Sequence, residues 1–241
     1  MHVAPRDCGN LSPRRTRAGV LVIWLVAGVA SVWLWAGCQH GPPKEAGPFR
    51  PTDLVELAGL TPGLQLDIRY AGTNNFMHRP MYPQARAFLQ RPAAEALARA
   101  HRALEPKGYG LLIFDGYRPW SVTKLFWDAA SEAERKVEFV ANPKKGSRHN
   151  RGCAVDLTLY DLKTGREAVM PSAYDEFSER AYPTYAGGTA EERTRRDLLR
   201  SAMEAEGFAV YNAEWWHFDF LQWTNYRILN VSFEALSKPH P

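Results

Sequence analysis

Apolar and polar residues alternate along several stretches of this chain and predict short β-strands. Leu64–Tyr70, Ala154–Leu159 and Trp216–Phe220 alternate with a period of two, the pattern of a strand with one buried face. Residues 110–114 form a continuous apolar run that ends at Asp115-Gly116, a turn signal, and predict a buried strand.

Other stretches have helical spacing. Residues 92–106 and 191–206 each carry an apolar stripe and are followed closely by a glycine, which is typical of a helix end. A further helix is expected after Pro119, with Val122, Leu125 and Phe126 facing inward. The elements mix without a regular βαβ rhythm, and there is no glycine-rich nucleotide loop. The pattern therefore favours the α+β class, with one small, mainly antiparallel sheet packed with helices.

The first 38 residues form a targeting segment. Basic residues at 14–17 precede an apolar run, Ala18–Gly37, as in an export signal. Small residues directly before Cys38 resemble a bacterial lipoprotein box, in which Cys38 is lipidated and becomes the mature N-terminus. The run is also as long as the roughly 20 residues that a helix needs to span a bilayer, so an uncleaved membrane anchor is the alternative. Both interpretations place the working domain outside the cytoplasm, tethered to a membrane.

One domain is expected after this segment. Residues 39–50 are rich in proline, glycine and charge and predict a linker. From residue 51 to residue 241 there is no second linker and no internal repeat.

Charge and cysteine content narrow the function. The net charge is +4, but residues 1–37 hold four arginines and one aspartate, which leaves the rest of the chain nearly neutral. Arginines at 193–200 are interleaved with acidic residues, so no basic patch indicates a nucleic-acid partner. Without Cys8 and Cys38, Cys153 is the remaining thiol and has no disulfide partner. We expect it to be a small buried residue and not a metal ligand.

Two distant segments carry the residues of a metal site. His149 and Asp156 are seven residues apart, and Glu214 lies three residues before His217. Two imidazoles, one carboxylate ligand and a spare carboxylate meet the needs of a catalytic zinc site, which requires three protein ligands, an open position and a base. Each pair alone is weak evidence, and His40, His78 and His101 are interpreted as ordinary surface or core histidines. The occurrence of both pairs together in an exported domain predicts a zinc hydrolase.

The spacing of these residues sets geometric conditions. Neither a flat strand nor a helix brings side chains seven residues apart onto one ion, so Gly152 must turn the chain and Asp156 must point inward from its strand. His217 is expected on the neighbouring strand. A bend at 214–215 would leave Glu214 beside the metal, where it accepts a proton from water.

Arg118 follows a buried strand in Asp115-Gly116-Tyr117-Arg118-Pro119. A fixed guanidinium stabilises the negative charge that develops on a carbonyl oxygen during amide hydrolysis. Asp115 would orient this arginine. A purely structural ion pair at a turn is the alternative.

Three motifs of the chain resemble those of a known family. Ser-x-His-x-x-Gly-x-Ala-x-Asp (147–156), Glu-x-Trp-His (214–217) and Asp-Gly-Tyr-Arg-Pro (115–119) are similar to motifs of the zinc D-alanyl-D-alanine dipeptidases, including the vancomycin-resistance type. These are relatives of the D,D-carboxypeptidases and share the hedgehog fold. The resemblance covers nearly all of residues 52–220.

The resemblance implies a role for each matching position. It makes His149, Asp156 and His217 the ligands of one zinc ion per chain, Glu214 the catalytic acid and base, and Arg118 the transition-state stabiliser. It also places three residues near the bound dipeptide or its arginine: Ser147, Tyr70 and Asp115.

The implied reaction is zinc-dependent hydrolysis of D-Ala-D-Ala to two D-alanines. The export segment favours a role in turnover or salvage of peptidoglycan in the cell envelope over antibiotic resistance. A D,D-carboxypeptidase that trims longer peptidoglycan stem peptides is the first alternative. The second is a non-catalytic, envelope-binding lipoprotein that retains the fold.

Overall fold

The computed structural model describes residues 41–136 and 139–236. The predicted export signal or anchor at 1–38 and the first residues of the predicted linker lie outside these ranges. Within them, no helix combines the length and the apolar character needed to cross a membrane. The described residues form one compact unit.

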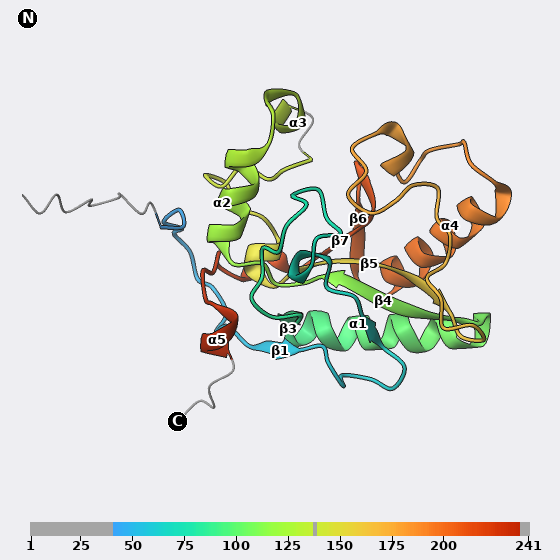
Figure 1. Cartoon of the computed structure of the whole chain (residues 1–241). Coiled ribbons are helices and arrows are strands. Elements are labelled where there is room, and N and C mark those ends of the chain that lie inside the picture. Colours follow the sequence, from blue (N-terminus) through green and yellow to red (C-terminus); the bar gives the residue numbers. More distant parts are fainter. Residues whose placement is uncertain (1–40, 137–138, 237–241) are drawn as a thin grey trace, which may run out of the picture. The chain divides into compact units, whose positions relative to one another are not determined.

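The centre of this unit is a five-stranded sheet (Figure 1). The strands follow the order β2 (Gln65–Leu66), β4 (Tyr109–Asp115), β5 (Ala154–Asp161), β7 (Glu214–Phe220) and β6 (Phe208–Tyr211). Only the β2–β4 pair is parallel; the other three pairs are antiparallel. The predicted α+β class with a mainly antiparallel sheet is confirmed.

Short elements surround the sheet. A second, two-stranded sheet pairs β1 (Leu54–Glu56) with β3 (Phe88–Gln90). The helices are α1 (Arg91–Leu104), α2 (Trp120–Ala129), α3 (Glu132–Lys136), α4 (Ala190–Ala205) and α5 (Phe233–Leu236). The 3-10 turns are η1 (Arg69–Ala71), η2 (Glu105–Lys107), η3 (His149–Arg151), η4 (Glu179–Ala181) and η5 (Trp223–Asn225).

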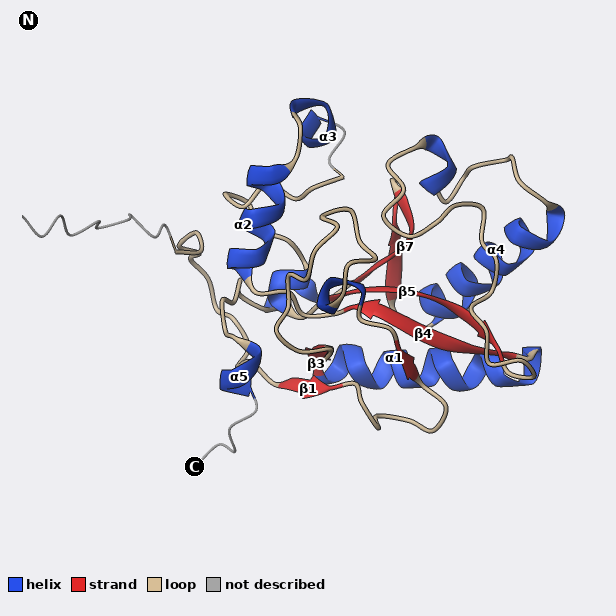
Figure 2. Ribbon diagram, viewed as in Figure 1, coloured by secondary structure: helices blue, strands red, loops and turns tan. Residues whose placement is uncertain are grey.

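The two long helices cover one face of the sheet. Helices α1 and α4 contact each other as well as the strands (Figure 2). Alternate residues of a strand point to opposite faces, so Leu111 and Ile113 of β4 enter this main core, while Leu112 and Phe114 belong to a separate cluster with Tyr160. The face away from α1 and α4 is therefore free to carry polar side chains, and Asp156 lies on it.

Most predicted elements are present, with two corrections. The predicted strand at 64–70 pairs only at Gln65–Leu66 and then turns into η1, where the amide of Asn75 donates to the carbonyl oxygen of Arg69. The second correction concerns Leu125, which was expected to face inward and is 48% exposed. Val122 and Phe126, which were also expected to face inward, are buried as predicted.

The described part of the predicted linker is fastened to the domain. Residues 41–50 contain neither helix nor strand, but the Glu45 carboxylate accepts hydrogen bonds from Arg151 Nη2 at 2.5 Å and from the Ile228 amide at 2.7 Å. The Arg50 amide also donates to the carbonyl oxygen of Asn225. This segment therefore lies along the C-terminal part of the chain.

Candidate metal centre and active site

Two neighbouring strands and one turn bring the predicted ligands together. The strands of Asp156 (β5) and His217 (β7) are neighbours, as the sequence predicted, and the two residues are direct pairing partners. His149 begins the turn η3, which ends at Gly152 with a left-handed φ of 66°. This backbone conformation favours glycine, and a Cβ atom on Gly152 would also displace the end of the Leu54 side chain, 2.4 Å away. The predicted turn between His149 and Asp156 is confirmed.

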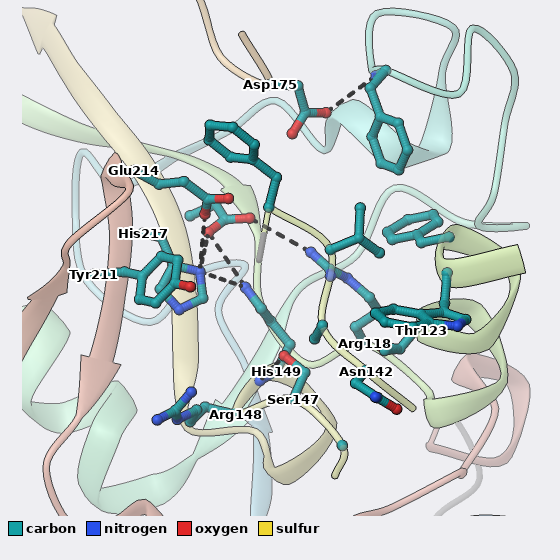
Figure 3. Close-up of a pocket in the computed structure, with 18 of the residues that line it drawn as sticks. Arg118, Thr123, Asn142, Ser147, Arg148, His149, Asp175, Tyr211, Glu214 and His217 are labelled. Atoms are coloured by element: carbon teal, nitrogen blue, oxygen red, sulfur yellow. Dashed lines mark hydrogen bonds and ion pairs between the residues drawn. The ribbon is translucent and has the colours of Figure 1, made fainter. Parts of the chain in front are cut away.

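The three side chains converge on a common point (Figure 3). His149 Nε2 lies 3.3 Å from Asp156 Oδ1 and 3.1 Å from His217 Nδ1. His217 Nδ1 lies 3.1 Å from Asp156 Oδ1. Among the described residues, these three form the one group whose ligand atoms are close enough to share a metal ion.

The outer hydrogen bonds show which atoms face this point. His149 Nδ1 lies 2.7 Å from the carbonyl oxygen of Gly116; a carbonyl only accepts, so Nδ1 carries the proton and Nε2 a lone pair. His217 Nε2 lies 3.0 Å from Asp219 Oδ1 and donates to that carboxylate, so Nδ1 is the ring nitrogen that faces the other two side chains. Asp156 Oδ1 is buried and has no hydrogen-bond partner. Two imidazole nitrogens and one carboxylate oxygen thus face one another.

This donor set fits zinc. Ligand atoms about 2.0–2.1 Å from a tetrahedral centre lie roughly 3.3–3.4 Å apart, close to the observed 3.1 to 3.3 Å. Although burial disfavours charge on His217, the Asp219 and Asp156 carboxylates raise its pKa well above the ordinary value. Burial also works against ionisation of Asp156, but the two histidines hold its pKa below the usual range. The site is therefore built for a cation.

Glu214 lies beside the triad on the same strand as His217. Pairing between β6 and β7 shifts from Val210–Phe218 to Tyr211–Glu214, so residues 215–217 bulge out of the β6 ladder, in line with the predicted bend. Glu214 Oε2 lies 3.7 Å from His217 Nδ1, and burial raises the pKa of this carboxyl to about 8. Glu214 is not part of the metal-ligating group.

Arg118 is fixed by Asp115. Asp115 Oδ2 accepts from Arg118 Nε at 2.9 Å and from Nη2 at 2.7 Å, while Tyr82 donates to Asp115 Oδ1 at 2.7 Å. The guanidinium also lies over the rings of Tyr70 and Phe126. Its Nη2 is 3.6 Å from Asp156 Oδ2. The predicted ion pair therefore holds a rigid positive charge next to the triad.

A pocket of about 420 Å³ opens over these residues. The predicted residues that line it are Tyr70, Arg118, Ser147, His149, Asp156, Glu214 and His217. Asp115 does not line the pocket and is 1% exposed, because it lies behind Arg118. Its hydrogen bonds to the site run through that arginine, and its Oδ2 lies 3.8 Å from His149 Nδ1.

Two site residues were missed by the sequence reasoning. The Asp175 carboxylate lines the pocket and lies 3.2 Å from the Tyr70 hydroxyl through each of its oxygens. Burial, followed by the charge of Asp156, raises its pKa to about 7. The preceding Tyr174 hydroxyl donates to Asp156 Oδ2 at 3.0 Å. Both residues lie in an irregular loop, and no periodicity or motif in the sequence indicated them.

The remaining thiol and histidine behave as expected. Cys153 is fully buried outside the ligand group, and burial raises the pKa of its thiol to about 12. His101 is a core residue whereas His78 is exposed. His40 lies outside the described residues.

Comparison with known proteins places this geometry in context. Residues 50–234 match the family model described as D-ala-D-ala dipeptidase (Peptidase_M15). A D-alanyl-D-alanine dipeptidase from Escherichia coli K12 is 33% identical over 188 residues, which cover 78% of this chain and 95% of that protein. The enzyme of the same name from Enterococcus faecium is 35% identical over 67% of this chain and 88% of its own length. Its counterpart from Enterococcus faecalis V583 is 36% identical, with 66% and 87% covered.

Proposed function

Because the chain belongs to the D-ala-D-ala dipeptidase family of zinc metallopeptidases, we propose that it hydrolyses D-Ala-D-Ala to two D-alanines with one zinc ion per chain. The observation that carries this proposal is the convergence of two imidazole nitrogens and one carboxylate oxygen within 3.3 Å of one another, in a pocket that also holds the buried carboxyl group of Glu214.

His149 Nε2, Asp156 Oδ1 and His217 Nδ1 are the atoms that would hold the ion. When bound, zinc acts as a Lewis acid toward the peptide carbonyl and lowers the pKa of water to about 7. The protein supplies the orientation of the donors, since Gly116, Asp219 and Tyr174 each bind the outward-facing atom of one ligand. Such outer contacts fix ligand orientation and basicity.

Glu214 moves the proton. Its carboxyl group is beside the triad without joining it, so it can accept a proton from the attacking water and deliver it to the leaving amine. A group whose pKa burial has raised to about 8 exchanges protons in both directions near neutral pH, as a general acid and base must.

Charged groups at the two ends of the pocket match a dipeptide. Asp175 lies on one side of the triad, and Ser147 and Arg148 lie on the other (Figure 3). A free ammonium group fits the partly buried Asp175 carboxylate with Tyr70, and a terminal carboxylate fits the side of Ser147 and Arg148. Arg118, held by Asp115, supplies positive charge to the carbonyl oxygen as negative charge develops there.

We place the enzyme outside the cytoplasm, tethered to a membrane through residues 1–38. Support comes from the basic and apolar pattern of that segment and from the small residues before Cys38. There it meets dipeptide released from peptidoglycan, which favours turnover or salvage. Labelling cells with a radioactive fatty acid tests the anchor: a Cys38→Ser variant that is labelled like the wild type contradicts acylation at Cys38.

The activity is tested by incubating the zinc-loaded full-length chain with D-Ala-D-Ala, L-Ala-L-Ala and a stem pentapeptide that ends in D-Ala-D-Ala. Free alanine is the readout. We expect release from D-Ala-D-Ala and little from the other two. Faster release from the pentapeptide makes the protein a D,D-carboxypeptidase, and no release from any substrate overturns the enzymatic proposal.

A further inference from the structure

We propose that Tyr174 is a positioning residue of the metal site, whose hydroxyl fixes the Asp156 carboxylate so that one chosen oxygen faces the two imidazoles. This inference rests on the proposed zinc site. It assigns a role to a loop residue that belongs to no motif and approaches the site only through the tertiary fold.

The two oxygens of Asp156 have different surroundings. Oδ1 lies 3.3 Å from His149 Nε2 and 3.1 Å from His217 Nδ1, without a hydrogen-bond partner. Oδ2 accepts a hydrogen bond from the Tyr174 hydroxyl at 3.0 Å. Arg118 Nη2, at 3.6 Å from the same oxygen, is beyond hydrogen-bond length. The hydroxyl therefore marks Oδ2 as the outer oxygen and leaves Oδ1 for the ion.

A carboxylate needs such a contact. The backbone of Asp156 is fixed because it pairs with His217 across the strands β5 and β7. The terminal torsion of an aspartate is broad and roughly two-fold, so the backbone alone does not fix the carboxylate plane. A donor on one oxygen removes this freedom before the ion binds, which lowers the cost of ordering the site.

The Tyr174 ring is itself well supported. Its centroid lies 4.8 Å from that of Phe114 on β4 and 5.5 Å from that of Trp216 on β7. Both partners are buried residues of the sheet. The ring is thus fixed by the same strands that carry the ligands, and its hydroxyl is a rigid donor.

The backbone conformation of Asp175 lets two consecutive loop residues contact the site. Neighbouring side chains of an extended chain point in opposite directions, but Asp175 has a left-handed φ of 58°. This turn lets the Tyr174 hydroxyl reach Asp156 while the Asp175 carboxylate lines the pocket beside Tyr70. A strained non-glycine backbone conformation is often found at functional sites.

Tyr174 also allows a clean experiment. Gly116, Asp219 and Tyr174 each hydrogen-bond one of the three proposed ligands. Gly116 does so through its backbone, which a substitution does not remove, and Asp219 carries a charge. Tyr174→Phe, in contrast, removes one neutral hydroxyl and keeps the ring. Tyr160→Phe is the matched control, because the buried Tyr160 hydroxyl donates to the carbonyl oxygen of Gly63 on another part of the sheet. Both variants lose one tyrosine hydrogen bond.

The test measures metal binding by the full-length chain. The dissociation constant for zinc is determined by competition with a chromogenic chelator, and the visible spectrum is recorded with cobalt in place of zinc. For Tyr174→Phe we expect zinc binding about 10- to 100-fold weaker than wild type and an altered cobalt spectrum. For Tyr160→Phe we expect both to be unchanged. The metal-free variants should unfold at similar temperatures, since each loses one hydroxyl contact.

Two negative results are distinguishable. Wild-type zinc affinity and an unchanged cobalt spectrum in Tyr174→Phe overturn this inference and leave the metal site in place. A wild-type chain that binds no zinc overturns the proposed metal site and this inference together. Equal weakening in the Tyr160→Phe control also contradicts a specific role, because it shows a general effect of lost stability.

Discussion

Glu214 Oε2 lies 3.7 Å from His217 Nδ1, although residues three positions apart on a regular strand point to opposite faces. The register shift between β6 and β7 bulges residues 215–217 and brings both side chains into one pocket. β-Bulges commonly redirect side chains next to active sites. Because of the bulge, His217 can serve as a metal ligand, while Glu214 lies beside the three ligand atoms and can transfer protons.

The proton-transfer role of Glu214 predicts a selective loss in Glu214→Gln. We expect kcat to fall about 10²- to 10⁴-fold, with the zinc content unchanged because Glu214 is outside the ligand group. Turnover of D-Ala-D-Ala and metal analysis of the same sample provide the measurement. Glu95→Gln, an exposed position on α1, is the control. A fully active, metal-loaded Glu214→Gln enzyme removes the assignment.

The proposed ammonium site predicts a change in KM. Asparagine tolerates a left-handed backbone, so Asp175→Asn removes the charge and keeps the loop. A hydrogen bond to a charged group contributes about 1.5–3 kcal/mol, and KM for D-Ala-D-Ala should rise roughly 10- to 100-fold, with a smaller change in kcat. Steady-state kinetics provide the test, with the surface variant Asp128→Asn as the control. Unchanged KM contradicts the ammonium assignment.

The contact of Glu45 with the domain predicts an effect on stability. Glu45→Ala leaves the Arg151 guanidinium without this carboxylate and the Ile228 amide without its acceptor. Loss of hydrogen bonds that involve a charged group should lower the free energy of unfolding by about 1–3 kcal/mol. The control is Glu132→Ala, which breaks an exposed ion pair with Lys136; such surface pairs contribute about 0–1 kcal/mol, so this loss should be smaller. Urea unfolding measures both; equal effects contradict the attachment.

Burial of His101, outside the active site, should make the free energy of unfolding depend on pH. Its Nδ1 accepts from the Leu111 amide and its Nε2 faces the carbonyl oxygen of Pro62, which requires the neutral ring with the proton on Nε2. Burial lowers the pKa of His101 in the folded state. Below its unfolded pKa of about 6.5, the unfolded chain binds a proton that the folded chain does not, so stability falls as the pH decreases from about 6.5.

The measurement compares wild type and His101→Gln, which does not titrate, by urea unfolding of the metal-free chain between about pH 7 and pH 5.5. The free energy of unfolding should decrease more steeply in the wild type than in the variant as the pH falls. Parallel pH profiles of the two proteins contradict a neutral, buried His101.

The sequence predicted what depends on local pattern. The long helices α1 and α4 begin and end within two residues of the expected positions, because apolar spacing and terminal glycines are local signals. The pairing of Asp156 with His217 could be predicted since both lie on alternating stretches with specific motifs.

The remainder depends on long-range contacts. Tyr70 was predicted to lie near the dipeptide, but its partner Asp175 is 105 residues further along in an irregular loop. The strand predicted at 64–70 is short because η1 turns Tyr70 toward that loop. Leu125 was misplaced because Val122, Leu125 and Phe126 have the spacing of one helix face, and only the tertiary packing decides that Leu125, at the edge of this face, stays 48% exposed.

Anomalous diffraction from crystals of the zinc-loaded full-length chain, recorded on both sides of the zinc absorption edge, tests the central claim most directly. We expect one zinc peak per chain, about 2.0–2.2 Å from His149 Nε2, His217 Nδ1 and Asp156 Oδ1, with Glu214 outside the coordination sphere. A hydrolytically active protein whose zinc is held by other residues, or which shows no peak at these three atoms, contradicts it.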